Sequence, residues 1–534
     1  MGTLWCNGTF FTMRKEGEAV ESVYVENGEI VALGRRETLL HKYKNQIENV
    51  EDVEGGYVYP GFVDSHLHMI GHGETMVRLD LSNVTSVEEL KRKLKEKVKT
   101  LAKGDWLLAE GWNENHFAER TILNRAELDE ICPHHPLYLT RICRHAALVN
   151  SQALKLSGID RHTPNPKGGV IVRDHQGEPT GYLLDSATDI VKNVIPNVSE
   201  SYIHQALELA VNDLLQKGIV GAHTEDLAYY GGFVRTLKQF THVIDGHKKK
   251  FRAHLLVHHE ALDEMQEQGY SFGELTPFIE LGAIKLFADG ALGGRTALLS
   301  EPYSDDPSTS GVAIHSEQSL KSIIQRAREY SQPVAIHTIG DGALKMALDA
   351  LEQYPLEKGR DRLIHVQVAN KQLIERMKSL PVILDIQPRF VVSDFPWVME
   401  RLGEERMDYS FAWNTLLDAG LICAGGSDAP IEPVDPLLGI HAAVTRRKKG
   451  EDHEGYLPNE KLTPFEAIQL FTKGSAFAIS KEQSRGFIDQ GYIADFTIFD
   501  QDLCQIEPDE LLATKVLMTV VDNTVMYRYS EQKD

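Results

Sequence analysis

The sequence is poor in cysteine and has none at metal-binding spacing. Its five cysteines are scattered over 534 residues, and no two form a Cys-x-x-Cys pair. The sequence therefore predicts neither a disulfide framework nor a thiolate zinc site. No apolar run approaches the ~20 residues of a transmembrane helix, and the N-terminal residues lack an apolar stretch of signal-peptide length. We expect a cytoplasmic protein without a membrane partner.

Positive charge is also in short supply. Lys and Arg number 56 against 78 Asp and Glu, which gives a formal net charge of −22. Nucleic-acid binding needs clustered basic surface, and the one basic run, at 247–250, fits a solvated helix end or loop. We therefore expect no nucleic-acid partner. Hydrophobic residues make up 42% and charged residues 25%, which is ordinary for a soluble globular protein.

The chain is longer than one simple globule, because single cores stop growing at about 250–300 residues. Both ends have short strand-like runs with turn signals, such as Asn27-Gly28 near the start and the runs at 495–500 and 515–521 near the end. One small β-sandwich built from both ends would bury their apolar faces. We assign its N-terminal part to 1–57 and its C-terminal part to 488–534.

Between the ends, strand-like and helix-like segments alternate, which is typical of a parallel α/β fold. Eight candidate core strands predict a (β/α)8 TIM-like barrel over 58–487. The first two are separated by far more than a usual βα connection, so 70–200 is interpreted as an inserted subdomain over the barrel mouth. The predicted core strands are 57–66, 218–225, 252–258, 282–288, 333–337, 362–366, 382–387 and 421–428.

Two histidines stand near the end of the first predicted strand, in Asp64-Ser65-His66-Leu67-His68. Side chains alternate along a strand, so His66 and His68 both face the barrel lumen. Two imidazoles at the C-terminal end of a barrel strand form a natural pair of metal ligands. By itself, such a pair is as readily a polar strand end that bonds water.

Other predicted strand ends carry similar residues. His337 ends the fifth strand, His365 ends the sixth, and Asp428 follows the last. Barrel enzymes place their chemistry at these ends, and buried imidazoles or carboxylates are costly unless paired or bound to metal. Lys285 lies in the apolar fourth strand, where it must pair, lose its charge or be modified. A salt bridge to Asp289 or Asp428 is its structural alternative.

These segments resemble the amidohydrolase superfamily, in particular its YtcJ-like branch (amidohydrolase family 3), which includes N-substituted formamide deformylases. The resemblance runs over nearly the whole chain. It implies a metal-dependent hydrolase that cleaves a non-peptide C–N bond of a small-molecule substrate (an amide, formamide or related group) by attack of metal-activated water. The matching segments are DSHLH, KLFADGALGGRTA, HTIGDGA, RLIHVQ and GSDAP, with GWNENHF, RHAALVNSQAL and GYIADFTIFD.

The resemblance also implies roles for individual residues. His66 and His68 match the pair that holds the more buried metal, and His337 and His365 match ligands of a second metal. Lys285 matches a lysine that, when carboxylated by CO2, bridges two metals as a carbamate.

Asp428 matches an aspartate that binds metal and handles the proton of the attacking water, which makes it the expected catalytic residue. One or two divalent metal ions are the expected cofactors. Zinc suits imidazole and oxygen ligands, while iron, manganese and nickel stay open.

Several polar residues in the family-like motifs are candidates for substrate binding. Each is as readily a structural hydrogen-bonding residue of a loop. His223 and the pair His258-His259 also lie near strand ends, where satisfied histidines are common. The substrate-binding candidates are Trp112, Arg141, His145, Asn150, Asp289, Arg295 and Gln387.

Two other functions stay open at this point. Deaminases of the same superfamily use one metal and a glutamate shortly after the fifth-strand histidine, whereas His337 is followed by Thr-Ile-Gly-Asp-Gly-Ala. A catalytically silent barrel that binds a ligand or a partner for regulation is the other alternative, because a fold alone does not fix a function. Specificity depends on loops, so the substrate is not predicted. A homodimer is the expected assembly.

Overall fold

The computed structural model describes residues 2–101, 104–114, 117, 121–141, 146–166, 169–196 and 198–530. The chain divides into two compact units. Unit 1 comprises Met1–His72 and Leu207–Asp534, and unit 2 comprises Gly73–Ala206. Unit 2 covers most of the segment 70–200 that the sequence analysis interprets as an insertion.

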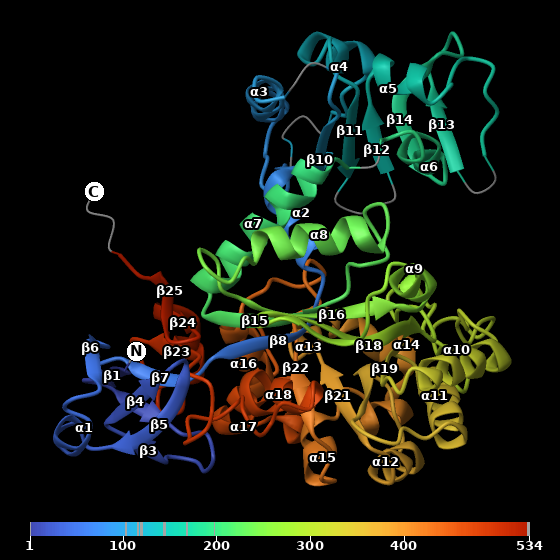
Figure 1. The fold of residues 1–534 in the computed structure, drawn as a ribbon. Coiled ribbons are helices and arrows are strands. Elements are labelled where there is room, and N and C mark those ends of the chain that lie inside the picture. Colours follow the sequence, from blue (N-terminus) through green and yellow to red (C-terminus); the bar gives the residue numbers. More distant parts are fainter. Residues whose placement is uncertain are drawn as a thin grey trace. The chain divides into compact units, whose positions relative to one another are not determined.

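Unit 1 is built around eight parallel strands (Figure 1). The first and last strands meet, because Asp428 N donates to His66 O (2.7 Å) and His68 N donates to Ala429 O (2.8 Å). The sheet is therefore a nearly closed barrel, and the predicted TIM-like architecture is confirmed. In spatial order its strands are β22 (Cys423–Gly425), β21 (Val382–Ile386), β20 (Asp361–His365), β19 (Val334–Thr338), β18 (Ile279–Phe287), β16 (Arg252–His258), β15 (Ile219–Thr224) and β8 (Phe62–Leu67), with β17 (Gly273–Thr276) antiparallel to β18.

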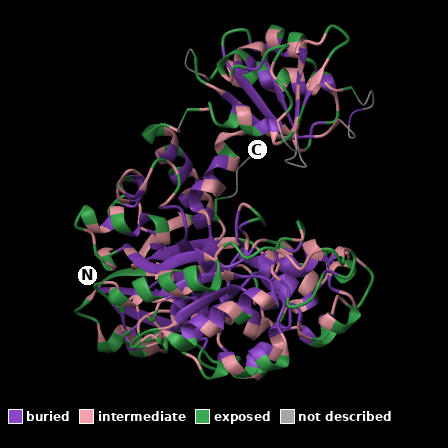
Figure 2. Cartoon of the chain, turned by 90° about the vertical axis from the view of Figure 1, so that its right-hand side faces the viewer, coloured by how far each residue is buried: buried purple, intermediate pink, exposed green. Residues whose placement is uncertain are grey.

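Most helices of unit 1 cover the barrel, whereas α1 packs on strands β1, β4 and β5 of the end sheet. In α11 (Asp341–Gln353), Leu344, Leu348 and Leu351 recur at helical spacing and are buried. Figure 2 shows the result, with buried strands inside and exposed helix faces outside. The other helices of unit 1 are α1 (Arg36–Lys42), α8 (Phe233–Val243), α9 (Leu262–Glu267), α10 (Glu317–Glu329), α12 (Lys371–Lys378), α13 (Phe390–Asp394), α14 (Trp397–Leu402), α15 (Trp413–Asp418), α16 (Pro436–Thr445), α17 (Pro464–Gln469) and α18 (Ser475–Ala478).

Strands from both chain ends share a sheet, seen as blue and red strands side by side in Figure 1. Trp5 packs edge-on against Phe496, with 5.7 Å between ring centroids, so side chains of the two end sheets meet. That these sheets form the expected sandwich stays a prediction. The six-stranded sheet is β25 (Thr524–Arg528), β24 (Val516–Val521), β23 (Phe496–Phe499), β7 (Tyr57–Pro60), β2 (Thr9–Phe11) and β3 (Ala19–Val20); the four-stranded sheet is β5 (Glu29–Gly34), β4 (Ser22–Glu26), β1 (Gly2–Cys6) and β6 (Ile47–Asp52).

The first predicted core strand, 57–66, is wrong as a single strand. Its first part is β7 of the end sheet, and its second part is β8 of the barrel. Gly61 lies between them: its N donates to Asp495 O (2.8 Å), and a Cβ there would lie 2.5 Å from Val220 Cγ2. The chain changes sheets at a point where only glycine fits.

Unit 2 contains a six-stranded sheet of its own. Helices α3 and α4 begin at side-chain caps: Ser86 Oγ accepts from Glu89 N (3.2 Å), and Asn124 forms a capping box with Glu127. The sheet order is β13 (Gly169–Arg173), β14 (Pro179–Asp185), β12 (Ala146–Val149), β11 (Leu137–Arg141), β10 (Leu107–Trp112) and β9 (Leu79–Asp80). The helices are α3 (Val87–Val98), α4 (Arg125–Ile131), α5 (Ser151–Leu156) and α6 (Ala187–Lys192), while α2 (Met69–Val77) and α7 (Glu200–Gln216) have residues in both units.

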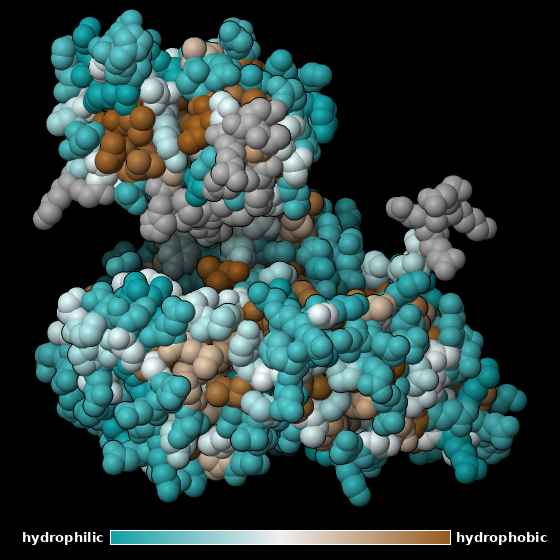
Figure 3. Space-filling model, turned by 180° about the vertical axis from the view of Figure 1, so that it is seen from behind, coloured by the Kyte–Doolittle hydropathy of each residue, from teal (hydrophilic) through white to brown (hydrophobic). Residues whose placement is uncertain are grey.

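The surface is mainly hydrophilic on the face that Figure 3 shows, with scattered apolar patches. None of the helices in the described part of the chain has the length and apolarity needed to cross a membrane.

Candidate metal centre

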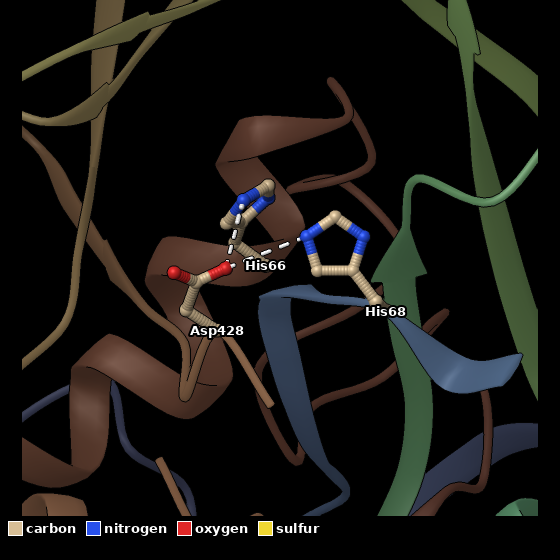
Figure 4. Close-up of side chains that lie close together, drawn as sticks. All are labelled: His66, His68 and Asp428. Atoms are coloured by element: carbon tan, nitrogen blue, oxygen red, sulfur yellow. Dashed lines mark ion pairs between the residues drawn. The ribbon is translucent and has the colours of Figure 1, made fainter. Parts of the chain in front are cut away.

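Two imidazoles and a carboxylate converge where β8 and β22 end (Figure 4). Nε2 of His66 lies 3.5 Å from Oδ1 of Asp428, and Nε2 of His68 lies 3.6 Å from the same oxygen. Each residue offers one ligand atom, and these atoms lie within 4.8 Å of one another. Among the described residues, no other group of three or more His, Cys, Asp or Glu meets this criterion.

The backbone around this triad is strained. Asp428 has φ 58°, His365 has φ 76°, and Val366 has φ 44°. Aspartate and histidine tolerate the left-handed region, but a β-branched valine does not adopt it without cost. Strain of this kind clusters at functional sites. Gly426 permits the close approach of the two strands, because a Cβ there would lie 2.6 Å from His66 N.

Asp64 ties the first and last barrel strands together. Its carboxylate accepts N–H groups from His66 (3.0 Å) and from Ser427 (3.1 Å to Oδ2). Burial raises the pKa of Asp64 to about 7, although hydrogen bonds from Ser427 and His66 oppose that rise. The sequence predicts no role for Asp64, whereas in the structure it anchors the strand that carries both histidines.

Glu225 directly follows β15 and is completely buried. Its backbone oxygen lies 2.8 Å from His68 Nδ1. With Nδ1 as the protonated nitrogen, Nε2 of His68 is left free to face Asp428. The Glu225 carboxylate accepts from Tyr229 OH (3.1 Å) through Oε2, whereas Oε1 has no hydrogen-bond partner among the described residues.

Lys285 projects into the lumen from β18 with a side chain that is only 1% exposed. Its Nζ lies 3.9 Å from Glu225 Oε2 and 4.1 Å from the centre of the Phe287 ring. Burial lowers the pKa of Lys285, and the charges of Glu225 and Asp428 oppose this. The ion-pair partner of Lys285 is therefore Glu225, whereas the structural alternative in the sequence named Asp289 or Asp428.

His337 and His365 lie beside the triad. Their ring centroids are 4.5 Å apart, and the His365 ring is 5.6 Å from that of His66. His365 Nδ1 lies 2.7 Å from Gln387 Oε1, and His337 Nε2 lies 3.0 Å from Gly290 O. These acceptors select one tautomer for each ring and leave the other nitrogen free to bind an ion.

Burial keeps three imidazoles of the site neutral, which is the form that binds metal, whereas His68 is paired with Asp428. Burial holds the pKa of His66 and His337 well below the usual value and lowers that of His365 to about 4, so these imidazoles are neutral. Burial also disfavours charge on His68, but the Asp428 carboxylate raises its pKa to about 9. Burial opposes ionisation of Asp428, yet His68 lowers its pKa overall, which keeps it a carboxylate.

The substrate-binding candidates of unit 1 have distinct surroundings. Asp289 is buried and accepts from three backbone N–H groups, those of Leu298, Ile339 and Gly340 at 2.8–3.0 Å. Gln387 holds His365, as described above. Arg295 is partly exposed and pairs with Asp305 at 2.8 Å. Asp289 and Gln387 therefore lie next to the proposed ligands, and Arg295 is engaged in a salt bridge.

The candidates of unit 2 have structural partners. Trp112 is 1% exposed in the core of unit 2 and donates its indole N–H to Leu139 O (3.0 Å). Arg141 binds both oxygens of Glu114, at 2.8 and 2.9 Å. Asn150 caps α5 by accepting from Ala153 N (3.1 Å). His145 lies outside the described residues.

The remaining histidines near strand ends are not part of the triad. His258 stacks on His259, with ring centroids 4.6 Å apart. His223 contacts His254 instead, at 5.1 Å between centroids.

Sequence reasoning missed several charged residues in the lumen. Glu225 and Asp64 are two of them. A buried ion pair between Arg362 Nε and Asp385 Oδ2, at 2.7 Å, is another, and Arg362 also donates to Ser65 O (2.6 Å). The available signal was a charged residue inside an apolar strand pattern, as in 382–386, where a lone aspartate interrupts Val-Ile-Leu-Asp-Ile.

A His-His-Asp group at the carboxyl ends of a parallel barrel is an arrangement suited to metal-dependent hydrolases. Comparison with known proteins agrees with this assignment. The sequence model of a protein family described as "Amidohydrolase family" matches residues 49–527, so the chain belongs to that family. Family membership and the neighbours below support a hydrolase.

Two relatives and one solved structure are similar over nearly their full lengths. The chain is 49% identical to a Bacillus subtilis protein named as an amidohydrolase, YtcJ, over 99% of this chain and 100% of that protein. It is 27% identical to the N-substituted formamide deformylase of Arthrobacter pascens, over 98% and 97% of the two chains. The crystal structure of an uncharacterized metal-dependent hydrolase from Pyrococcus furiosus matches with a TM-score of 0.81 and 28% identity, over 95% and 100%.

Proposed function

We propose that the protein is a metal-dependent hydrolase that cleaves a non-peptide carbon–nitrogen bond of the amide or formamide type. The observation that carries this proposal is the convergence of His66, His68 and Asp428 at the mouth of the barrel. Membership of the amidohydrolase family and similarity to an N-substituted formamide deformylase support the choice of bond.

The donor set fits a divalent ion. His66, His68 and Asp428 would hold it, and two imidazoles with one carboxylate are ligands that zinc favours. Nδ1 of His66 is buried and has no hydrogen-bond partner in the described part of the chain, so the ring is free to turn into its ligand position. A bound ion would lower the pKa of a water molecule and polarise the scissile carbonyl.

A second ion would take His337 and His365 as ligands. Both rings are buried, neutral and held by a carbonyl or amide oxygen on one side. Lys285 would complete that site as a carbamate formed with CO2. The present partner of Lys285 is the Glu225 carboxylate. A carbamate on Lys285 would be a second anion beside it in a buried site, so its formation would depend on the positive charge of the bound ions.

Asp428 is the group best placed to move the proton. Its Oδ1 faces both first-strand imidazoles, and its carboxylate form persists at neutral pH. It would accept the proton of the attacking water and return it to the leaving nitrogen, a role worth about 10²–10⁴-fold in rate. Phe390 stacks on His365 at 5.9 Å, and the Phe287 ring lies 5.2 Å from that of His337.

The test is a metal analysis of protein purified without chelator or a metal-affinity tag, together with hydrolysis assays on N-acyl and N-formyl amines. About two ions per chain would support the paired site with a carboxylated Lys285. About one ion per chain would favour a mononuclear centre and would support the deaminase alternative. No ion, even after addition of zinc or manganese with bicarbonate, would overturn the proposal in favour of a ligand-binding barrel. His66→Asn should lose metal, and the exposed His247→Asn should retain it.

A further inference from the structure

A second group of polar side chains lies at the mouth of the barrel, beyond the candidate metal centre. Its members follow the three neighbouring strands β20, β21 and β22. Gln367 comes two residues after His365, Glu432 comes four residues after Asp428, and Asp394 is the last residue of α13, the helix after β21. The carboxyl ends of parallel strands meet at one end of a barrel, so this group shares that end with the proposed ligands.

Helix α13 directs Asp394 toward the site. Phe390 and Asp394 are four residues apart in this helix and therefore share one face. The Phe390 ring stacks on the His365 ring at 5.9 Å between centroids, with 9° between the ring planes. Oδ2 of Asp394 accepts a hydrogen bond from Nε2 of the buried Gln367 (3.0 Å). The carboxylate thus lies beside the segment that leads away from a proposed metal ligand.

Asp394 makes no ion pair with any described residue. Its Oδ2 accepts from Gln367, and its Oδ1 accepts from none of the described residues. Burial raises the pKa of Asp394 to about 7 against that hydrogen bond, and the charge of Glu432 adds to the rise. The nearby cation Arg389 is already in use, because its Nε donates to Glu432 Oε2 (2.6 Å). Asp394 is therefore a desolvated carboxylate without a counter-charge of its own.

Such a carboxylate is costly, because a charge taken out of water needs a partner. A purely structural partner for Gln367 would not need the charge, since an amide oxygen accepts the same hydrogen bond. Groups kept in an unfavourable ionic environment beside a site are candidates for function. The missing partner of Asp394 is a cation, and its place at the mouth of the barrel lets a substrate supply it.

We propose that Asp394 determines specificity in the proposed hydrolysis by binding an ammonium group on the amine portion of the substrate. This inference rests on the proposed function and narrows it. The substrate class is an N-formyl or N-acyl diamine, with one nitrogen in the scissile bond and the other protonated. The ammonium group donates to Oδ1, while Gln367 holds Oδ2 in place.

The first test compares two substrates of equal length, N-(4-aminobutyl)formamide and N-pentylformamide, which end in an ammonium and a methyl group. At pH 8, kcat/KM of the wild type should be at least about tenfold higher for the ammonium compound, because hydrogen bonds to charged groups contribute on that order. Asp394→Asn keeps an acceptor for Gln367 and should lose the preference, mainly through KM. Glu400→Gln, on an exposed position of α14, is the matched control and should retain it.

A second measurement needs no turnover. The metal-loaded protein is titrated with n-butylammonium chloride and with n-butanol, and binding is followed by calorimetry and by the rise in Tm. The ammonium ion should bind at least about tenfold more tightly than the alcohol, and Asp394→Asn should abolish the difference. The titration is repeated with His66→Asn, where the binding should persist because the ammonium ion is not a metal ligand.

The outcomes separate this proposal from the proposed function. If neither formamide is hydrolysed but the wild type binds the ammonium ion and Asp394→Asn does not, the proposed function fails and the ammonium subsite is supported. Equal kcat/KM of the wild type for the two formamides would overturn the subsite while the hydrolase remains. An undiminished preference for the cation in Asp394→Asn, in either measurement, would also overturn it and leave Asp394 with a structural role.

Discussion

Nζ of Lys285 lies 3.9 Å from Oε2 of Glu225, and neither side chain has appreciable contact with solvent. A buried cation on the fourth barrel strand thus faces a buried carboxylate at the end of the second. Removal of one member of such a pair costs about 3–5 kcal/mol, because the other charge stays behind without compensation. The stability of the barrel therefore depends on an ion pair that lies in the candidate metal centre.

Glu225→Gln should therefore lower the free energy of unfolding by about 3 kcal/mol, as measured by chemical denaturation of the metal-free protein. Tyr229→Phe removes only the hydrogen bond to Oε2 and should cost about 1 kcal/mol. Glu375→Gln is the control, because its ion pair with Lys378 lies on the surface, with side chains 61% and 40% exposed, and such a pair contributes little. Unchanged stability in Glu225→Gln would show that Lys285 does not depend on this carboxylate.

Asp428→Ala should reduce kcat by about 10²–10⁴-fold, because the proposed proton acceptor is lost. Metal content should stay largely intact, since both first-strand imidazoles remain. Elemental mass spectrometry and steady-state kinetics on the same preparation separate these effects. Asp418→Ala, on an exposed position at the end of α15, is the control. Turnover at the wild-type rate would remove Asp428 from the mechanism.

Gln387→Leu should weaken metal binding by about 10–100-fold, because His365 Nδ1 loses the acceptor that fixes its tautomer. Chelator competition gives the affinity directly. Gln387→Glu keeps an acceptor oxygen and should therefore keep most of the metal affinity. If the leucine and glutamate variants bind metal equally well, the hydrogen bond has no part in positioning His365.

Asp394→Asn should make the protein more stable at pH 8 than the wild type. Burial raises the pKa of Asp394 to about 7 from an ordinary 3.8, against the hydrogen bond from Gln367. As pH rises, the unfolded chain therefore releases the Asp394 proton at a lower pH than the folded chain does. The wild type thus loses stability as pH rises from about 4 to 7. The difference is on the order of 2–4 kcal/mol.

Denaturation curves at pH 5 and pH 8 measure this effect. An amide oxygen at position 394 can still accept from Gln367 Nε2, so packing is preserved. Asp418→Asn should leave the pH dependence as it is in the wild type. If the wild type and Asp394→Asn lose the same amount of stability between pH 5 and pH 8, the prediction is contradicted.

Much of the barrel and its triad could be predicted from the sequence. The alternation of side chains along a strand is a local property, so the shared direction of His66 and His68 follows from their spacing. The role of Glu225 could not be predicted, because its partner Lys285 lies on a different strand and their proximity depends on barrel closure. The same holds for Arg362 and Asp385.

Other differences arise from packing that sequence patterns do not record. An apolar pattern continues through Gly61, and only the approach of Val220 shows that the chain changes sheets there. The indole of Trp112 is in a motif that resembles a functional one, yet its N–H is used by a backbone oxygen in the core of unit 2. Motif membership alone does not separate core residues from site residues.

The connection from β7 to β8 through Gly61 affects how the protein matures during synthesis. The strand with His66 and His68 leaves the ribosome early in synthesis. Its neighbour β7, however, pairs with β23, and Asp428 follows β22, and both β22 and β23 are made late. The triad therefore cannot assemble until residues close to the end of the chain have left the ribosome. A chain that ends before Asp428 has both imidazoles without their carboxylate, so loading of the proposed metal would be a late step of biogenesis.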